Sequence, residues 1–449
     1  MSNLNLRSIT GKDGHPVQFP TGIMIGSGAS GGINNIGIPG QAGFGAGVCP
    51  GPLPAGMGGL PDYQNVLADN YGNYQYSDGS VMVWIPAFYY KWGTGANGVT
   101  LNQVSIKPFS DYADVATANA AGYALHRAFY DGGAVQAGVF VDKYLPSYNG
   151  GIASSKKNGI PLASALRGGI ANTNFASLTG TPADFYYGAI AAAKTRGSSF
   201  FTSSRFIFAA MALLAYAHGQ ASSTTTYCAW YHATNNFPKG CNNNALGDAQ
   251  DAAILYLTDG TGTNCPKTGS ANLFARTTHN GQNSGVADLN GTLWEIAPGL
   301  ASETAGTHYY ALKTSARMKD MTAGVGGALD LWGTAGQLAA NYDDLGTTYG
   351  LALASDSAKY YGNAAQVFSE ATSGLPWQWA GLGGPLAGGG GGTNPFGNDN
   401  FLDYQPGDMC PFSGGAWSYS SSAGVWALHL GNVRGASNAS VGFRAALYL

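Results

Sequence analysis

The sequence predicts an α+β fold that is rich in loops. Two helical patterns stand next to each other near the middle of the chain, and segments with strand character lie before them and at the C-terminal end. Strands and helices do not alternate as in a doubly wound sheet, so two core helices and short antiparallel sheets are expected. Glycine accounts for 69 of the 449 residues, about twice its usual share of roughly 7%. This content predicts many turns and loops.

Residues 1–75 are predicted to form an irregular N-terminal arm that precedes the main domain, residues 76–449. Gly and Pro punctuate 23–61 without a helical period. The segment could be a flexible linker or an arm that docks on a neighbouring subunit. Its isolated Ile, Met, Phe and Leu residues favour the docked arm, because a pure linker would be more polar. We expect it to attach the chain to a larger particle or to other subunits.

The elements of the main domain follow from local patterns. Residues 80–92 and 137–147 are rich in β-branched and aromatic residues and are predicted strands. Residues 183–197 have an apolar face and end at Gly, which predicts a helix. Residues 203–219 begin with Ser caps and also end at Gly, which predicts a second helix. Loops and short strands are expected beyond Gly219.

Composition excludes several classes of protein. Charged residues are 10% of the chain, against roughly 25% in typical soluble proteins. The basic residues are scattered and form no stripe that could neutralise a phosphate backbone, so no nucleic-acid partner is expected. The longest apolar stretch, 206–217, is shorter than the roughly 20 residues that span a bilayer, so a buried helix is predicted there and no membrane insertion. Residues 1–14 lack the pattern of a signal peptide.

The five cysteines show no CxxC spacing, so a zinc site has little support. One disulfide among Cys228, Cys241 and Cys265 is an option, and buried free thiols are favoured over it.

Four motifs occur in order along the chain, namely "MVWIPAFYY" (82–90), "FVDKY" (140–144), "NGTLWEI" (290–296) and the pair "GGAW" (414–417) and "VGFRAALYL" (441–449). Together they resemble the formylglycine-generating-enzyme-like (sulfatase-modifying-factor) branch of the C-type lectin fold. The resemblance covers roughly residues 80–449 and implies that fold. The same scaffold occurs in phage receptor-binding proteins and in the variable proteins of diversity-generating retroelements. The whole chain resembles a phage tail or virion protein of that kind.

The motif residues have predicted structural roles. Trp294 and Trp417 are large enough to organise a small core, and each indole N–H needs a partner. Arg444 needs a carboxylate or carbonyls, and Glu295 is the candidate. The full structural set is Trp294, Glu295, Gly415, Trp417, Gly442, Phe443 and Arg444.

Catalysis is not expected. The resemblance places the two catalytic cysteines of the enzyme branch at Tyr419 and Gly424, and neither residue can supply a thiolate. The seven histidines form no HExxH pattern. A polysaccharide-acting enzyme remains a distant third hypothesis, since no carboxylate pair stands out as a dyad.

No cofactor is expected, with calcium as the one option. The resemblance implies calcium binding around the "NGTLWE" residues Asn290, Gly291, Leu293 and Glu295. A hydrogen-bonded turn is the alternative and is favoured.

The C-terminal segment 417–438 has the chemistry of an antibody paratope, in which Tyr and Trp give broad contact and Ser, Gly and Asn give adaptable hydrogen bonds. The predicted receptor-binding residues are Tyr419, Ser420, Ser421, Ser422, Trp426, His429, Asn432, Arg434 and Asn438. The alternative is that residues such as Val425, Ala427 and Leu428 belong to the core and the rest is an ordinary loop. In diversity-generating systems this region varies, and its Ser, Tyr, Asn and His content is consistent with that.

Two functional hypotheses follow from the resemblance. The first is a tail-fibre or receptor-binding protein that recognises a glycan or protein on the host cell surface. The second is a structural virion component, such as a head decoration or head-fibre protein, in which the fold packs between subunits. Both place the chain in the virion, bound to other virion proteins through the N-terminal arm. A homo-oligomer is expected, and related tail proteins imply a trimer.

Overall fold

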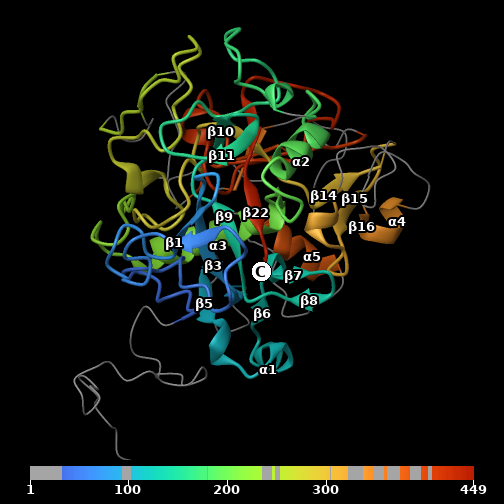
Figure 1. The fold of residues 1–449 in the computed structure, drawn as a ribbon. Coiled ribbons are helices and arrows are strands. Elements are labelled where there is room, and N and C mark those ends of the chain that lie inside the picture. Colours follow the sequence, from blue (N-terminus) through green and yellow to red (C-terminus); the bar gives the residue numbers. More distant parts are fainter. Residues whose placement is uncertain are drawn as a thin grey trace, which may run out of the picture.

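The computed structural model describes residues 33–93, 103–178, 180–234, 245–247, 253–303, 305–321, 337–346, 358–361, 375–384, 396–402 and 407–449. These residues combine a few helices with many short strands, as the α+β prediction requires (Figure 1). The α-helices in the described residues are α1 (Val115–Ala120), α2 (Tyr186–Lys194), α3 (Arg205–Ala221), α4 (Gln337–Asn341) and α5 (Leu375–Leu382).

The first large sheet has six strands, and every neighbouring pair is antiparallel. Its order is β1 (Met57–Gly59), β2 (Asn73–Tyr76), β3 (Val81–Pro86), β9 (Gly138–Asp142), β22 (Ala445–Leu447) and β12 (Phe201–Thr202). The C-terminal strand β22 therefore lies inside this sheet, between β9 and β12. Figure 1 shows β22 beside β9.

The second large sheet also has six strands but is mixed. Its order is β17 (Ala358–Tyr360), β18 (Asn400–Leu402), β20 (Leu428–His429), β19 (Phe412–Ser413), β13 (Trp294–Ile296) and β21 (Val441–Phe443). The pairs β18–β20 and β13–β21 are parallel. The other pairs of this sheet are antiparallel, so the expected short antiparallel pairing is present, with parallel pairing added at these two places.

Smaller sheets complete the fold in the described residues. Two have three strands: one consists of β14 (Leu300–Ser302), β15 (Tyr309–Leu312) and β16 (Tyr342–Gly346), and the other of β5 (Val104–Pro108), β4 (Phe88–Trp92) and β6 (Ala124–Leu125). Two have two strands: β10 (Pro146–Asn149) pairs with β11 (Ile152–Ser155), and β7 (Tyr130–Asp131) pairs with β8 (Ala134–Val135). The predicted strands 80–92 and 137–147 correspond to β3, β4, β9 and the start of β10.

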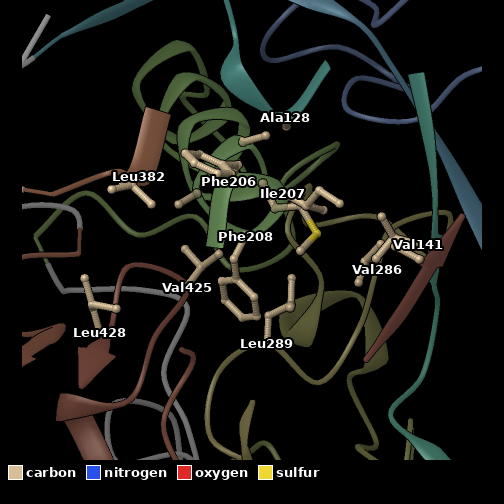
Figure 2. Close-up of a cluster of buried hydrophobic side chains, with 14 of the residues drawn as sticks. Ala128, Val141, Phe206, Ile207, Phe208, Val286, Leu289, Leu382, Val425 and Leu428 are labelled. Carbon is tan, nitrogen blue, oxygen red and sulfur yellow. The ribbon is translucent and has the colours of Figure 1, made fainter. Parts of the chain in front are cut away.

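The helix α3 is the centre of the core. The Ser204 side chain caps it by accepting a hydrogen bond from the Ile207 N–H. Nearly every residue of α3 is buried, which is typical of a helix that is apolar on all sides. Figure 2 shows Phe206, Ile207 and Phe208 of this helix among side chains from distant segments, including Val425. The predicted buried helix is therefore confirmed, and so is α2.

The helix α3 ends at Ala221, two residues later than predicted. Beyond that end, the Ser222 N–H donates to the His218 carbonyl at 3.1 Å, and its hydroxyl donates to the same carbonyl at 2.6 Å. These bonds cap the last turn at Ser222, so Gly219 stays inside the helix.

The described part of the N-terminal arm belongs to the main body. Ile36 and Phe44 are fully buried in the central core, and β1 and β2 are strands of the first sheet. The boundary at residue 75 therefore does not separate two structural units within residues 33–93. Residues 33–75 pack on their own chain, and docking of the 1–75 arm on a neighbouring subunit stays a prediction. Residues 1–32 lie outside the described residues.

Two polar side chains hold this segment in place. His279 Nε2 donates to the Gly45 carbonyl at 2.9 Å, while its Nδ1 accepts from the Val286 N–H. His218 Nδ1 accepts from the Gly40 N–H at 3.0 Å, and its ring stacks on Phe44. Both imidazoles must be neutral to accept these bonds.

Cys49, Cys228, Cys265 and Cys410 are buried free thiols, which agrees with the favoured option. Cys241 lies outside the described residues. Within the described part of the chain, no helix combines the length and the apolar character needed to cross a membrane.

Candidate functional site

The two sequence motifs at 290–296 and 441–449 meet in the second sheet. β13 pairs in parallel with β21, and Glu295 lies opposite Gly442. A side chain at position 442 would not fit, because a Cβ there would lie 2.6 Å from the Leu162 carbonyl oxygen. Glycine is therefore required for the strands to approach the 162 segment this closely.

Arg444 lies between β21 and β22 and so connects the two large sheets. Its Nε and Nη2 each donate to one carboxylate oxygen of Glu295, both at 2.9 Å. Two of its remaining three N–H groups donate to the carbonyls of Asp142 and Ala287, both at 2.8 Å. The predicted Glu295–Arg444 partnership is confirmed, and both side chains are buried. Burial raises the pKa of the Glu295 carboxyl, and the Arg444 charge opposes that shift.

A second buried pair extends this network. Asp142 of β9 binds Arg196 through both carboxylate oxygens, and it also accepts from the Ala445 N–H. Arg196 follows the end of α2 and also donates to the Ala153 carbonyl. The charged groups thus fix α2, β9 and the C-terminal strands relative to one another.

The loop after the "GGAW" motif is closed at its base by backbone hydrogen bonds. The Gly414 N–H donates to the Ala427 carbonyl at 3.1 Å, and the Gly424 N–H donates to the Gly414 carbonyl at 2.9 Å. Gly415 has φ +90°, and a Cβ there would lie 2.8 Å from the Ala423 Cα. The two ends of the loop can pack this closely only because residue 415 is glycine.

Buried Trp294 is the point around which the candidate residues gather. The rings of Tyr419 and His429 both meet its indole edge-on, with centroids 5.0 and 5.6 Å away. The Asn432 side-chain amide lies 3.1 Å from His429 Nδ1. The turn that contains Asn438 adjoins Trp294, since the backbone N–H of Trp294 donates to the Ser440 carbonyl.

The sequence gives no signal for the residue that supports this turn. Ser164 Oγ donates to the Asn438 carbonyl and accepts from its N–H. Asn438 Oδ1 accepts in turn from the N–H and hydroxyl of Ser440. Because Ser164 is 274 residues away in sequence, only the folded structure reveals this contact.

Two predicted receptor-binding residues are not on the surface. Trp426 is 2% exposed, and its ring packs with those of Trp92 and Tyr361. Arg434 is fully buried and forms an ion pair with Asp408. The assignment of both residues to the receptor-binding surface was therefore wrong. Their buried side chains stabilise the loops from the interior of the protein. Val425, Ala427 and Leu428 are also buried, so the core alternative holds for that part of the segment.

The remaining candidates are partly or fully exposed. We name them the C-terminal surface, which consists of Tyr419, Ser420, Ser421, Ser422, His429, Asn432 and Asn438. Ser420–Ser422 form a short 3-10 helix at the tip of the loop. Three further residues of the same segment are exposed and were not predicted, namely Ser418, Val433 and Ser437.

The indole N–H groups of Trp294 and Trp417 have no hydrogen-bond partner among the described residues. The expectation that each would find one was therefore wrong within that part of the chain. Trp417 packs instead against the buried guanidinium of Arg167, 5.8 Å from its ring centroid. Arg167 is itself paired with Asp259 at 3.0 Å.

The predicted calcium ligands do not fit a calcium ion. Both carboxylate oxygens of Glu295 are bound to Arg444, which leaves Asn290, Gly291 and Leu293 without an anionic partner in the set. Calcium requires six to eight oxygen ligands, usually with carboxylates among them. The described residues also contain no group of three His, Cys, Asp or Glu side chains arranged to hold a metal ion.

No protein-family model matches the sequence, and no curated protein matches it. Among solved structures, the Major Tropism Determinant I1 variant is similar at 14% identity and a TM-score of 0.28, over 82% of this chain and 63% of that chain. The Major Tropism Determinant U1 variant is similar at 12% identity and the same TM-score of 0.28, over 83% and 65%. The chain thus spans less than two thirds of either structure. A TM-score of this size describes a weak likeness, and it assigns no property to this chain.

Proposed function

We propose that this chain is a phage virion protein of the tail-fibre or receptor-binding type, which recognises a glycan or protein on the host cell through the C-terminal surface. One observation supports the proposal above all. Tyr419, His429 and Asn432 gather around buried Trp294 on loops that backbone hydrogen bonds hold at their base. Aromatic faces and amide groups on a rigid frame bind sugars or peptides at low entropic cost.

Binding by weak individual contacts is compatible with two further features, a rigid sheet framework and avidity. The Glu295–Arg444 and Asp142–Arg196 pairs fix both large sheets beneath the surface. Several copies of the chain on one particle would strengthen binding by avidity. The motif resemblance supports a virion location, with residues 1–32 proposed to attach the chain to the particle.

Binding to intact bacterial cells and to their extracted envelope glycans tests the proposal. The test variant combines Tyr419→Ala, Ser421→Arg and Asn432→Ala, all at residues of the C-terminal surface. The matched control combines Tyr148→Ala, Ser223→Arg and Gln75→Ala, which alter an exposed Tyr, an exposed Ser and an exposed side-chain amide elsewhere. We expect the test variant to bind at least about tenfold more weakly, as the loss of a central contact costs 1–2 kcal/mol or more.

The competing role is a structural virion component. If neither the unchanged protein nor the control binds cells or glycans, while the protein incorporates into particles, the structural role replaces the proposed one.

A further inference from the structure

A pocket that is lined by three cationic side chains lies outside the C-terminal surface. It has a volume of about 760 Å³ and opens between the 69–70, 143–144, 225–229 and 272–283 segments. Lys143, Lys157 and Arg276 line it, and Asp69 is the acidic residue of its lining. Three basic side chains face one acidic side chain among its described lining residues, although the net charge of the whole chain is −3. Such clefts attract anionic ligands.

An aromatic ring lies among these cations. Lys157 Nζ is 5.0 Å from the centroid of Phe274, and Lys143 Nζ is 5.6 Å from it. The Tyr144 ring lies 6.0 Å from the same centroid. Phe274 is only half-buried, so part of its apolar surface faces the pocket that it lines. A sugar ring commonly packs against such a surface while its charged substituent meets the neighbouring cations.

Lys143 is the unusual member of the site. It is only 4% exposed, yet its Nζ donates to two neutral acceptors, Asn73 Oδ1 and the Asn283 carbonyl. An ammonium group has three N–H donors, so one is available for a ligand. A buried cation without a bonded counter-charge is costly, and burial accordingly lowers the pKa of Lys143 to about 7. An anion in the pocket would supply the missing charge.

We propose that this pocket binds an anionic saccharide, whose carboxylate or phosphate lies near Lys143, Lys157 and Arg276 and whose ring lies against Phe274. The site shares no residue with the C-terminal surface. It can therefore be present or absent independently of the proposed receptor function.

Calorimetric titration of the full chain tests this inference. The probes are a galacturonic acid trimer, the neutral galactose trimer, a hexose phosphate and inorganic phosphate. We expect the charged trimer to bind at least about tenfold more tightly than the neutral one, since hydrogen bonds to charged groups are stronger than those between neutral groups. Comparing the hexose phosphate with the charged trimer shows which anion the site prefers. Tighter binding of inorganic phosphate than of either sugar would contradict a saccharide site.

Two neighbouring lysines provide a matched pair of variants. Lys157→Gln removes an exposed charge of the pocket, whereas Lys156→Gln removes the adjacent charge, which does not line it. Neither change should prevent folding, since neither side chain is buried. We expect Lys157→Gln to weaken binding of the anionic sugar about tenfold and Lys156→Gln to leave it unchanged. Equal effects of the two variants, equal binding of charged and neutral trimers, or no binding of any probe would overturn the inference.

Discussion

Arg444 donates two hydrogen bonds of 2.9 Å to the two carboxylate oxygens of Glu295, and neither side chain is exposed to solvent by more than 1%. The pair links β13 to the junction of β21 and β22, and so joins the two large sheets. A planar guanidinium satisfies a carboxylate in this two-bond geometry, which a Lys ammonium cannot reproduce.

Removing one member of this pair should strongly destabilise the protein. We expect Arg444→Met to lower the free energy of unfolding by about 3–5 kcal/mol, because it leaves the buried Glu295 carboxylate uncompensated. The double variant with Glu295→Leu should recover part of that loss. Chemical denaturation measures both. The exposed Lys107–Asp111 pair is the control, since Lys107→Ala should cost no more than about 1 kcal/mol. An equal, small effect of both single variants would contradict a structural role for the buried pair.

The stability contributed by neutral, buried His218 and His279 should be lost as the pH falls from about 6.5 towards 4. Burial lowers the pKa of His218 to about 4 and that of His279 to about 4. In that range the unfolded chain binds protons that the folded chain does not, so unfolding is favoured by up to about 1.4 kcal/mol per pH unit for each histidine. This stability is complete above pH 6.5 and decreases as the pH falls towards the folded pKa values.

Unfolding midpoints across this pH range check the effect. His279→Gln should reduce the slope of stability against pH by about one histidine's share, or 1.4 kcal/mol per unit. The exposed His232 provides the control substitution, His232→Gln. Since both buried imidazoles bind the 40–45 segment, the protection factor of the Gly40 amide, which corrects for the intrinsic pH dependence of exchange, should also decrease in acid. A slope that His279→Gln leaves unchanged would rule out this account.

The loop of the C-terminal surface should depend on the glycine at position 415. Gly415→Ala forces a side chain into a backbone with φ +90° and against the Ala423 backbone. We expect a loss of about 2–4 kcal/mol in stability, together with weaker cell binding. Gly58→Ala is the matched control, since an added Cβ there meets nothing within 4 Å. If both variants unfold at the same denaturant concentration, the loop does not need glycine.

Local features of the sequence predicted those parts of the fold that local physics determines. The caps and apolar runs of α2 and α3 are contained in single segments, and the partnership of Glu295 with Arg444 follows from the chemistry of two motifs. The packing of residues 33–75 on their own chain was not predicted, because it involves contacts with His218 and His279, which lie far away in sequence. No pattern within residues 33–75 indicates these partners.

The candidate surface was predicted only in part for a similar reason. Composition identifies a segment rich in Tyr, Trp, Ser and Asn, but it does not tell which of these side chains point inward. Trp426 is buried because Asp399 binds its backbone N–H and aromatic rings surround its side chain. Arg434 is buried because Asp408 neutralises it. The cationic pocket was missed because Lys143, Lys157 and Arg276 come together only on folding.

Hydrogen–deuterium exchange of the full chain, with and without the envelope glycan fraction that it binds, tests the central claim most directly. Recognition through the C-terminal surface predicts that the bound fraction slows exchange in residues 418–422 and 429–438. The buried residues 425–428 should change little, because they are already shielded. Unchanged exchange in both exposed segments, with protection elsewhere in the described chain, would contradict the claim.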